Sequence, residues 1–165
     1  MTVDNRKTIV QLRIRLFIAT VLLIAWIIVI YFAKAIKFPL LGMEDNIWTL
    51  ILVIIYFIIA FYPMFLNYQY IFYSDEDDKI IVRYYNTGIA TGKKNSVEIR
   101  KDVFAGYKVE KKLLGLDRQV ILFQKVPKGI AKYPPLHIGA LTKSERGKIL
   151  NSLYQHSPAD AAEVK

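Results

Sequence analysis

Two histidines are the side chains in this sequence best suited to proton transfer near neutral pH. His137 follows the pair Pro134-Pro135 in a short extended stretch, and His156 lies at the fraying end of a predicted helix. Nucleophilic catalysis needs a base within reach of a hydroxyl or thiol, and neither histidine has a carboxylate beside it in sequence. We therefore predict structural or solvated roles for both histidines, no catalytic residue, and a protein that is not an enzyme.

A run of four acids, from Asp75 to Asp78, offers the oxygen ligands that divalent cations prefer. An EF-hand-type loop also needs alternating ligands, a glycine at its sharp turn and a closing glutamate, and these are missing. We interpret the run as a solvated turn between two strands that discourages edge pairing. The sequence also lacks cysteine and a glycine-rich loop followed by Lys-Ser or Lys-Thr. No metal, cofactor or small-molecule substrate is predicted.

Basic side chains form the predicted contact surface. Lys108, Lys111, Lys112 and Arg118 flank a predicted hairpin. A basic residue close to an anionic leaflet contributes about 1 kcal/mol, so several together could hold a domain against acidic headgroups or an acidic partner. The alternative is an ordinary solvated basic surface. No recognisable nucleic-acid reading motif accompanies these residues, so no nucleic-acid partner is expected.

Two uncharged apolar runs dominate the N-terminal half of the chain and must position everything that follows. They cover 16–33 and 46–74, which are 18 and 29 residues long. A helix rises about 1.5 Å per residue, so roughly 20 residues cross the hydrocarbon core of a bilayer. We predict membrane spans over about 16–36 and 46–67, joined into a helical hairpin within 16–68.

The distribution of positive charge predicts the orientation of this hairpin. The segment 1–15 contains four basic residues against Asp4, and the chain after Asn67 has 17 Lys or Arg and 11 Asp or Glu. Positive residues near span ends stay on the cytoplasmic side, so we predict an inner (plasma) membrane protein with both termini in the cytoplasm. An alternative is a signal peptide cleaved near Ala33-Lys34-Ala35, although its apolar core is longer than usual. Cleavage would leave the C-terminal domain in the same compartment.

From Tyr70 onward the hydrophobic pattern changes to a period of two, which is typical of short strands separated by polar turns. Thr142 and Glu145 have the spacing of a helix-capping box, and Leu153 follows on the apolar face of that helix. The sequence therefore predicts an α+β membrane protein, in which a small antiparallel β-barrel or sheet over 69–156 is capped by one C-terminal helix. The last residues, 157–165, are small and polar and are predicted to be disordered.

The order of six or seven short strands and one helix, together with the stretch Phe104-Ala105-Gly106-Tyr107-Lys108-Val109, resembles the pleckstrin-homology-like (PH-like) architecture over 70–155. Bacterial versions of it are often attached to a pair of transmembrane helices. The resemblance implies a bent barrel plugged at one end by the helix, and binding rather than catalysis. Phosphoinositide-binding members collect basic residues around their first hairpin loop, whereas the equivalent turn here, Asp75 to Asp78, is acidic. An unrelated α+β sheet with one covering helix is the alternative.

These observations predict a membrane-anchored, non-enzymatic interaction or scaffolding module at the cytoplasmic face. It would bind a protein partner or a second copy of itself, by adding a strand at an exposed sheet edge. The alternative is a peripheral sensor of anionic lipid or surface charge that uses Lys108, Lys111, Lys112 and Arg118. A further alternative is an accessory subunit of a transport or secretion complex, although two spans alone line no pathway and neither contains an ionisable residue.

Overall fold

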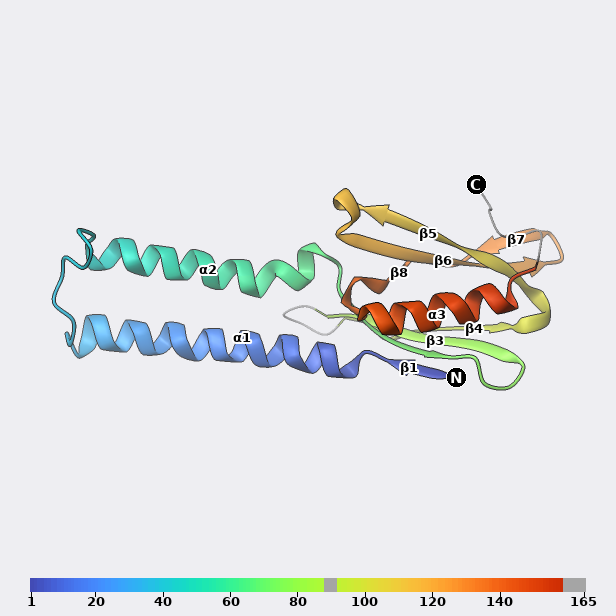
Figure 1. The fold of residues 1–165 in the computed structure, drawn as a ribbon, viewed down its shortest axis with the longest axis horizontal. Helices are drawn as coiled ribbons and strands as arrows, with labels where there is room; N and C mark the ends of the chain where they lie inside the picture. The colour runs from blue at the N-terminus through green and yellow to red at the C-terminus, as the bar shows by residue number, and fades with distance from the viewer. Residues whose placement is uncertain (88–91, 159–165) are drawn as a thin grey trace. The chain divides into compact units, whose positions relative to one another are not determined.

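The computed structural model describes residues 1–87 and 92–158 of the chain (Figure 1). The chain divides into two compact units. One unit, which we call the sheet domain, combines Met1–Ile9 with Met64–Lys165, and the other, the helical unit, is Val10–Pro63. The sheet domain is thus assembled from both ends of the chain, and the apolar segment is inserted into it.

The apolar segment forms two helices that are each long and apolar enough to cross a membrane. Helix α1 covers Arg6–Ile27 and continues through a wider π-helical turn over Ile28–Phe32, and helix α2 covers Asp45–Phe65. Pro63 lies in the last turn of α2, where the sequence predicts a kink or the approaching end of the helix.

Hydrogen bonds between hydroxyl and indole groups link α1 and α2 within the helical unit. The indole Nε1 of Trp26 donates to Thr49 Oγ1 at 3.1 Å, and Thr20 Oγ1 lies 3.4 Å from the Tyr56 hydroxyl. Thr49 Oγ1 also donates to a backbone carbonyl of its own helix, that of Asp45, at 2.9 Å. These polar side chains are therefore satisfied inside the hairpin, as an apolar environment requires.

The first sheet has four antiparallel strands in the order β1-β2-β3-β4. These are β1 over Thr2–Asp4, β2 over Gln69–Ser74, β3 over Lys79–Asn86 and β4 over Asn95–Arg100. The predicted hairpin with an acidic turn is confirmed as β2 and β3. Strand β1 has no counterpart in the sequence-based expectations, because it pairs with residues that follow both helices.

Asn5 explains how the N-terminal strand is held and where α1 begins. Its side chain is fully buried, and it accepts a hydrogen bond from the Ile71 N–H and donates one to the Gln69 carbonyl, both at 2.9 Å. The Asn5 carbonyl in turn accepts from the Ile9 N–H at 3.2 Å, in the first turn of α1. Asn5 thus follows the end of β1 and precedes the start of α1, and its side-chain amide bonds to β2 as a backbone peptide group would.

The second sheet is built on β6, which pairs antiparallel with three other strands. Its members are β5 over Phe104–Lys112, β6 over Asp117–Val126, β7 over Gly129–Lys132 and β8 over Leu136–His137. A bulge lies before Gly106, whose φ of 122° suits a residue without a Cβ atom.

Of the two predicted arrangements, a barrel or an open sheet, the closed barrel is not formed. Within the described residues no strand pairing joins one sheet to the other. The reason is the short 3₁₀ turn Lys101–Val103, at which the chain leaves β4 and passes to the second sheet, where β5 pairs with β6 instead. The fold is therefore α+β with two antiparallel sheets rather than one closed barrel.

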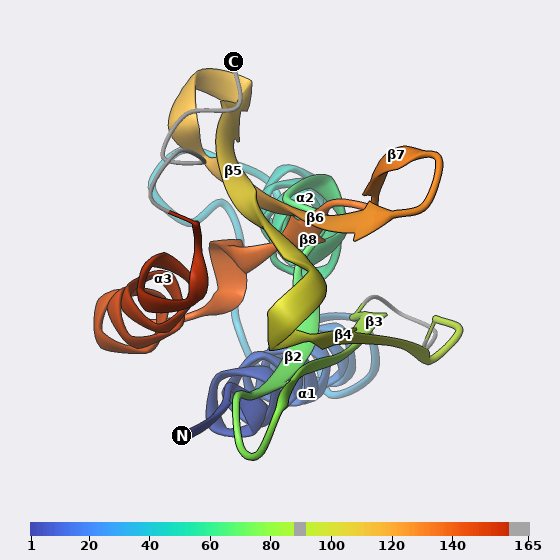
Figure 2. The same cartoon turned by 90° about the vertical axis from the view of Figure 1, so that its right-hand side faces the viewer.

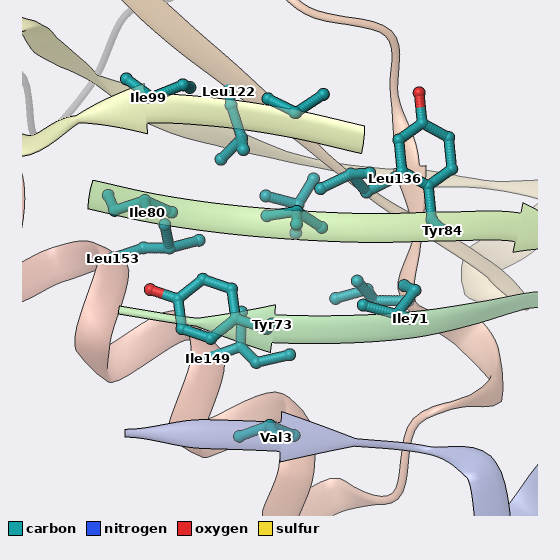
Figure 3. Close-up of a cluster of buried hydrophobic side chains, with 14 of the residues drawn as sticks. Val3, Ile71, Tyr73, Ile80, Tyr84, Ile99, Leu122, Leu136, Ile149 and Leu153 are labelled. Carbon is teal, nitrogen blue, oxygen red and sulfur yellow. The ribbon is translucent and has the colours of Figure 1, made fainter. Parts of the chain in front are cut away.

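Helix α3, over Lys143–His156, covers the core between the sheets (Figures 1 and 2). It starts at the predicted capping box: Glu145 N donates to Thr142 Oγ1 at 3.2 Å, and Thr142 N donates to Glu145 Oε2 at 2.7 Å. Its contacts reach the edge strands β1 and β5. Apolar side chains from both sheets and the helix form one cluster (Figure 3): Val3, Ile71, Tyr73, Ile80, Tyr84, Ile99, Leu122, Leu136, Ile149 and Leu153.

Candidate functional site

The directions of the strands give the sheet domain two distinct ends. β2 begins at Gln69, shortly after α2, and Asn86 at the end of β3 lies opposite it. The His137 N–H donates to Gln69 Oε1 at 2.9 Å, and His137 faces Gln119 on β6. The β5–β6 turn therefore lies at this same end, which we call the helix-proximal end (Figure 1). The acidic turn after β2 lies at the opposite end, which we call the distal end.

The four predicted basic contact residues do not form one face. Lys111 lies opposite Arg118 across the β5–β6 pair, whereas Lys112 lies opposite the buried Asp117. Because side chains alternate along a strand, Lys108 and Lys112 project from the other face of β5 than Lys111. Lys108 also pairs with Glu110 at 3.2 Å. The structure thus brings Lys111, Lys112 and Arg118 together at the helix-proximal end and sets Lys108 apart.

A basic and aromatic groove also lies at the helix-proximal end. It has a volume of about 510 Å³, and its lining comes from the first turn of α1 and from β2, β3 and the start of β4. Three of its lining side chains are the cations Arg6, Arg83 and Lys94. Within residues 1–87 and 92–158, none of these three cations forms an ion pair with a carboxylate. Their charges are consequently available to a ligand.

Stacked aromatic rings form the floor of this groove. Tyr70 and Tyr85 face each other across β2 and β3, with ring centroids 4.8 Å apart and planes 23° apart. The guanidinium carbon of Arg83 lies 5.9 Å from the centroid of the Phe72 ring. Burial, followed by the charge of the Asp4 carboxylate and a hydrogen bond to it, raises the pKa of Tyr70, so the Tyr70 hydroxyl is already engaged with Asp4. The three cations of the groove suit an anion with several acceptor oxygens, such as a phosphate.

A buried polar network behind the groove connects the two sheets. His137 Nδ1 lies 2.9 Å from Asp117 Oδ1, and Gln119 Nε2 donates to Asp117 Oδ2 at 2.8 Å. Gln69 Nε2 donates to Asn86 Oδ1 at 2.9 Å. His137 therefore has a carboxylate partner that comes from another strand and is not visible as a neighbour in sequence. The network joins β2, β3, β6 and β8 through hydrogen bonds, which restricts how the sheets can shift.

A second polar cluster, at the distal end, ties α3 to β2. The Tyr73 hydroxyl lies 2.7 Å from Ser152 Oγ, which in turn donates to the Asp75 carboxylate. The amino group of Met1 lies 2.5 Å from Asp75 Oδ1. Burial raises the pKa of Tyr73 to about 12. Burial also opposes ionisation of Asp75, but hydrogen bonds from the Met1 amino group and Ser152 outweigh it and hold the Asp75 pKa below its ordinary value.

This distal cluster differs from the sequence-based interpretation of the acidic run as a wholly solvated turn. Asp75 is partly buried and accepts hydrogen bonds, whereas Glu76, Asp77 and Asp78 are exposed. The difference arises because Ser152 approaches from a helix far along the chain.

Sequence reasoning did not identify Arg6, Arg83 or the groove's tyrosines as site residues. Arg83 and Tyr85 could have been recognised from the sequence. Residues two apart on a strand share one face, and here that face is not apolar, which indicates a surface open to a ligand. Arg6 carries no such signal, because it was assigned to a basic tail next to the predicted first span. Its place in the groove follows from the pairing of β1 with β2.

No protein-family model matches this chain, and the searches of curated proteins and of solved structures also returned no match. The proposals that follow therefore depend on the geometry and chemistry of the chain.

Proposed function

We propose that this is an integral membrane protein whose helical unit anchors the sheet domain at the cytoplasmic face of the inner membrane. The sheet domain then acts as a non-enzymatic binding module of PH-like architecture. The observation that carries this proposal is the insertion of two long apolar helices between β1 and β2, neighbouring strands of one sheet.

The exposure of the helices supports a bilayer as their surroundings. In the most apolar 18-residue stretch of each helix, 6% of the residues are buried for Arg6–Phe32 and 0% for Asp45–Phe65. Phe17, Leu22 and Ile58 are each more than 60% exposed. Apolar surface left in water costs about 25 cal/mol per Å², and helices in the core of a water-soluble domain would bury these side chains. In lipid the same surface carries no such cost, and helical backbone groups are satisfied internally.

The topology of the sheet domain supports a hairpin with both ends on one side. The chain leaves this domain through α1 and returns to it through α2, because β1 and β2 are hydrogen-bonded neighbours. Both helix ends joined to the sheet domain must therefore lie on the same side of a membrane. The basic segment before the first apolar run and the 17 Lys and Arg after Asn67 favour the cytoplasmic side.

The outer edge of β4, which pairs with no other strand within 1–87 and 92–158, supports binding to a protein partner or to a second copy of the chain. β4 is the terminal strand of the first sheet, and α3 contacts the other edge strand, β1. Val97 and Ile99 point into the core, so an added strand would align along backbone groups without disturbing the core. The order of antiparallel strands followed by one C-terminal helix agrees with the element order of the proposed PH-like architecture, although the sheets do not close into its barrel.

Membrane extraction and a topology reporter test the anchoring. We expect the full-length chain to stay in the membrane fraction after alkaline carbonate treatment and to be released by detergent. A reporter fused after residue 165 should be cytoplasmic, and a reporter placed in the loop 37–44 should lie on the opposite side, which provides an internal control. A chain in the soluble fraction, or both reporters on one side, would contradict the proposal.

Crosslinking in mild detergent tests the binding role. We expect either a stoichiometric protein partner or a defined homo-oligomer, whose crosslinks include β4. The substitution Ser96→Pro removes a backbone donor on this edge strand and should weaken the complex. A protein that remains monomeric and alone under these conditions would contradict the binding-module assignment.

Binding of anionic lipid is a second candidate function. The groove favours it, because its three cations form no ion pair with any carboxylate that the structure describes. Native mass spectrometry of the chain released from anionic nanodiscs is expected to show retained acidic lipid, which Arg83→Gln should reduce and added salt should weaken. Arg100→Gln is the matched control, because Arg100 lies at the distal end and already pairs with Asp102 at 2.6 Å. Equal retention in both variants would exclude the groove as the lipid site.

A further inference from the structure

Three leucines at the turn between β5 and β6 are exposed to an unusual degree. Leu113, Leu114 and Leu116 are 56%, 106% and 63% exposed. Single exposed apolar residues are ordinary on a protein surface, but three within four positions form a continuous apolar patch. We call these residues the leucine tip. They contribute little to the core of the domain.

The backbone of the leucine tip is also one that leucine adopts at a cost. Leu113 and Leu114 have φ angles of 49° and 57°, in the left-handed region where a Cβ atom crowds the backbone. Glycine or asparagine would suit these positions better. Leu114 is fully exposed among the residues that the structure describes, so burial of its side chain does not offset this strain. Strained, exposed apolar residues of this kind point to a contact outside the domain.

The leucine tip lies beside the point at which the chain emerges from α2. A Cβ atom added to Gly139 would lie 3.3 Å from the ring carbon Cε1 of Tyr68 and 3.7 Å from the carbonyl oxygen of Leu116. Tyr68 follows α2, which ends at Phe65, and precedes β2. The tip and the start of β2 are therefore at one end of the sheet domain, as Figure 1 shows.

Basic side chains surround the apolar patch. Lys111 and Lys112 precede the tip and Arg118 follows it, and Lys111 lies directly opposite Arg118. The one acid in this turn, Asp117, is buried and bonded to His137 and Gln119. Leucines with a basic border are the pattern of a segment that lies in a membrane interface, with apolar groups in the acyl boundary and cations at the phosphates. This border, and the proximity to the emerging α2, favour lipid over a protein partner.

We infer that the leucine tip inserts into the leaflet from which α1 and α2 emerge and forms a third membrane contact of the protein. This inference rests on the proposed function, because it requires the helical unit to lie in a bilayer. It goes beyond the groove and the β4 edge, since it assigns a direct lipid contact to a turn of the sheet domain.

The absence of cysteine allows a single label to test this contact in the full-length chain. The variant Leu114→Cys, labelled with an environment-sensitive fluorophore and placed in nanodiscs, is expected to show blue-shifted emission that brominated lipids quench. Ile130→Cys is the matched control: Ile130 is 61% exposed and lies beside the β6–β7 turn at the distal end. Its label should remain in water, accessible to iodide and unaffected by brominated lipid.

A second pair of variants separates lipid contact from folding. With the label moved to Leu116→Cys, the added substitution Leu114→Gly should reduce the ratio of inserted to free tip by about tenfold or more, since burial of a leucine favours apolar surroundings by at least that factor. The same substitution should leave the thermal stability of the domain unchanged or raised, because it relieves the left-handed strain. Charge reversal of Lys111 and Lys112 should weaken quenching in anionic nanodiscs more than in neutral ones.

Three outcomes would overturn the inference. A Leu114 label as water-exposed as the Ile130 label, in a chain that resists carbonate extraction, refutes the third contact and leaves the anchoring intact. A label shielded from iodide but insensitive to brominated lipid assigns the tip to a protein contact instead. A chain that does not stay in the membrane at all refutes the anchoring and the inference together.

Discussion

The helix-proximal and distal ends of the sheet domain are built from the same strands but use their polar side chains in opposite ways. At the distal end, Tyr73, Ser152 and Asp75 bond to one another and hold α3 against β2. At the helix-proximal end, the buried network around His137 and Asp117 lies beneath a surface whose cations have no carboxylate partner in the described chain, among them Arg6, Arg83 and Lys94. The difference indicates that the polar cluster of the distal end serves packing, whereas the helix-proximal end combines a stabilising buried network with cations that are available for contact.

The largest expected effect tests whether the N-terminal strand belongs to the sheet domain. Asn5→Ala leaves the buried Ile71 N–H and Gln69 carbonyl without partners, and each lost partner costs about 1–3 kcal/mol. We expect the free energy of opening at β1 and β2, measured by hydrogen exchange in nanodiscs, to fall by about 2–6 kcal/mol. Asn151→Ala, at an exposed position of α3, is the control and should change little. Unaltered exchange at β2 in Asn5→Ala would show that β1 is dispensable.

A smaller loss is expected at the distal end. Ser152→Ala leaves the buried Tyr73 hydroxyl without its partner, which should destabilise the packing of α3 by about 1–3 kcal/mol. Hydrogen exchange of α3 amides measures this loss. Ser96→Ala, in the exposed groove, should stay within about 0.5 kcal/mol of the parent chain. Equal losses of stability in Ser152→Ala and Ser96→Ala would contradict the proposed difference between the two ends of the sheet domain.

Acid should weaken the distal end selectively. The pKa of Asp75 is lower in the folded chain than the ordinary 3.8, so its stabilisation is complete above that ordinary value. It is lost as the pH falls below 3.8 and through the lower folded value. The protection factors of β2 and α3 amides near Asp75, which are corrected for the intrinsic pH dependence of exchange, should therefore fall below this pH and stay level above it. Asp75→Asn should remove this additional loss, and an identical acid profile in that variant would contradict the assignment.

The smallest effect on stability is expected in the groove. The double variant Arg83→Gln and Lys94→Gln removes two like charges that pair with no carboxylate in the described residues. We expect its unfolding free energy to change by no more than about 0.5 kcal/mol. Chemical denaturation in detergent measures this change. A decrease of several kcal/mol in the unfolding free energy would mean that these cations stabilise the fold and are not available to bind a ligand.

Features that depend on nearby residues were predictable. The composition of two long runs is enough to indicate apolar helices, because 18 or more uncharged residues exceed what most core helices need. The capping box at Thr142 and Glu145 depends on residues three apart and was confirmed by its reciprocal hydrogen bonds. The β2–β3 hairpin was likewise visible from two alternating runs around an acidic turn.

The sequence by itself determined the presence of the apolar helices, the first hairpin and the C-terminal helix, since each arises from contacts between residues a few positions apart. The tertiary structure alone decided that β1 joins a strand beyond both helices, that the sheets stay separate, and that Asp117 meets His137. It also decided that Arg6 shares a groove with Arg83 and that the leucine tip lies at the same end of the sheet domain as Tyr68. Such pairings join residues far apart in the chain, and hydrophobic periodicity specifies which face of a strand is buried but not which strand lies next to it.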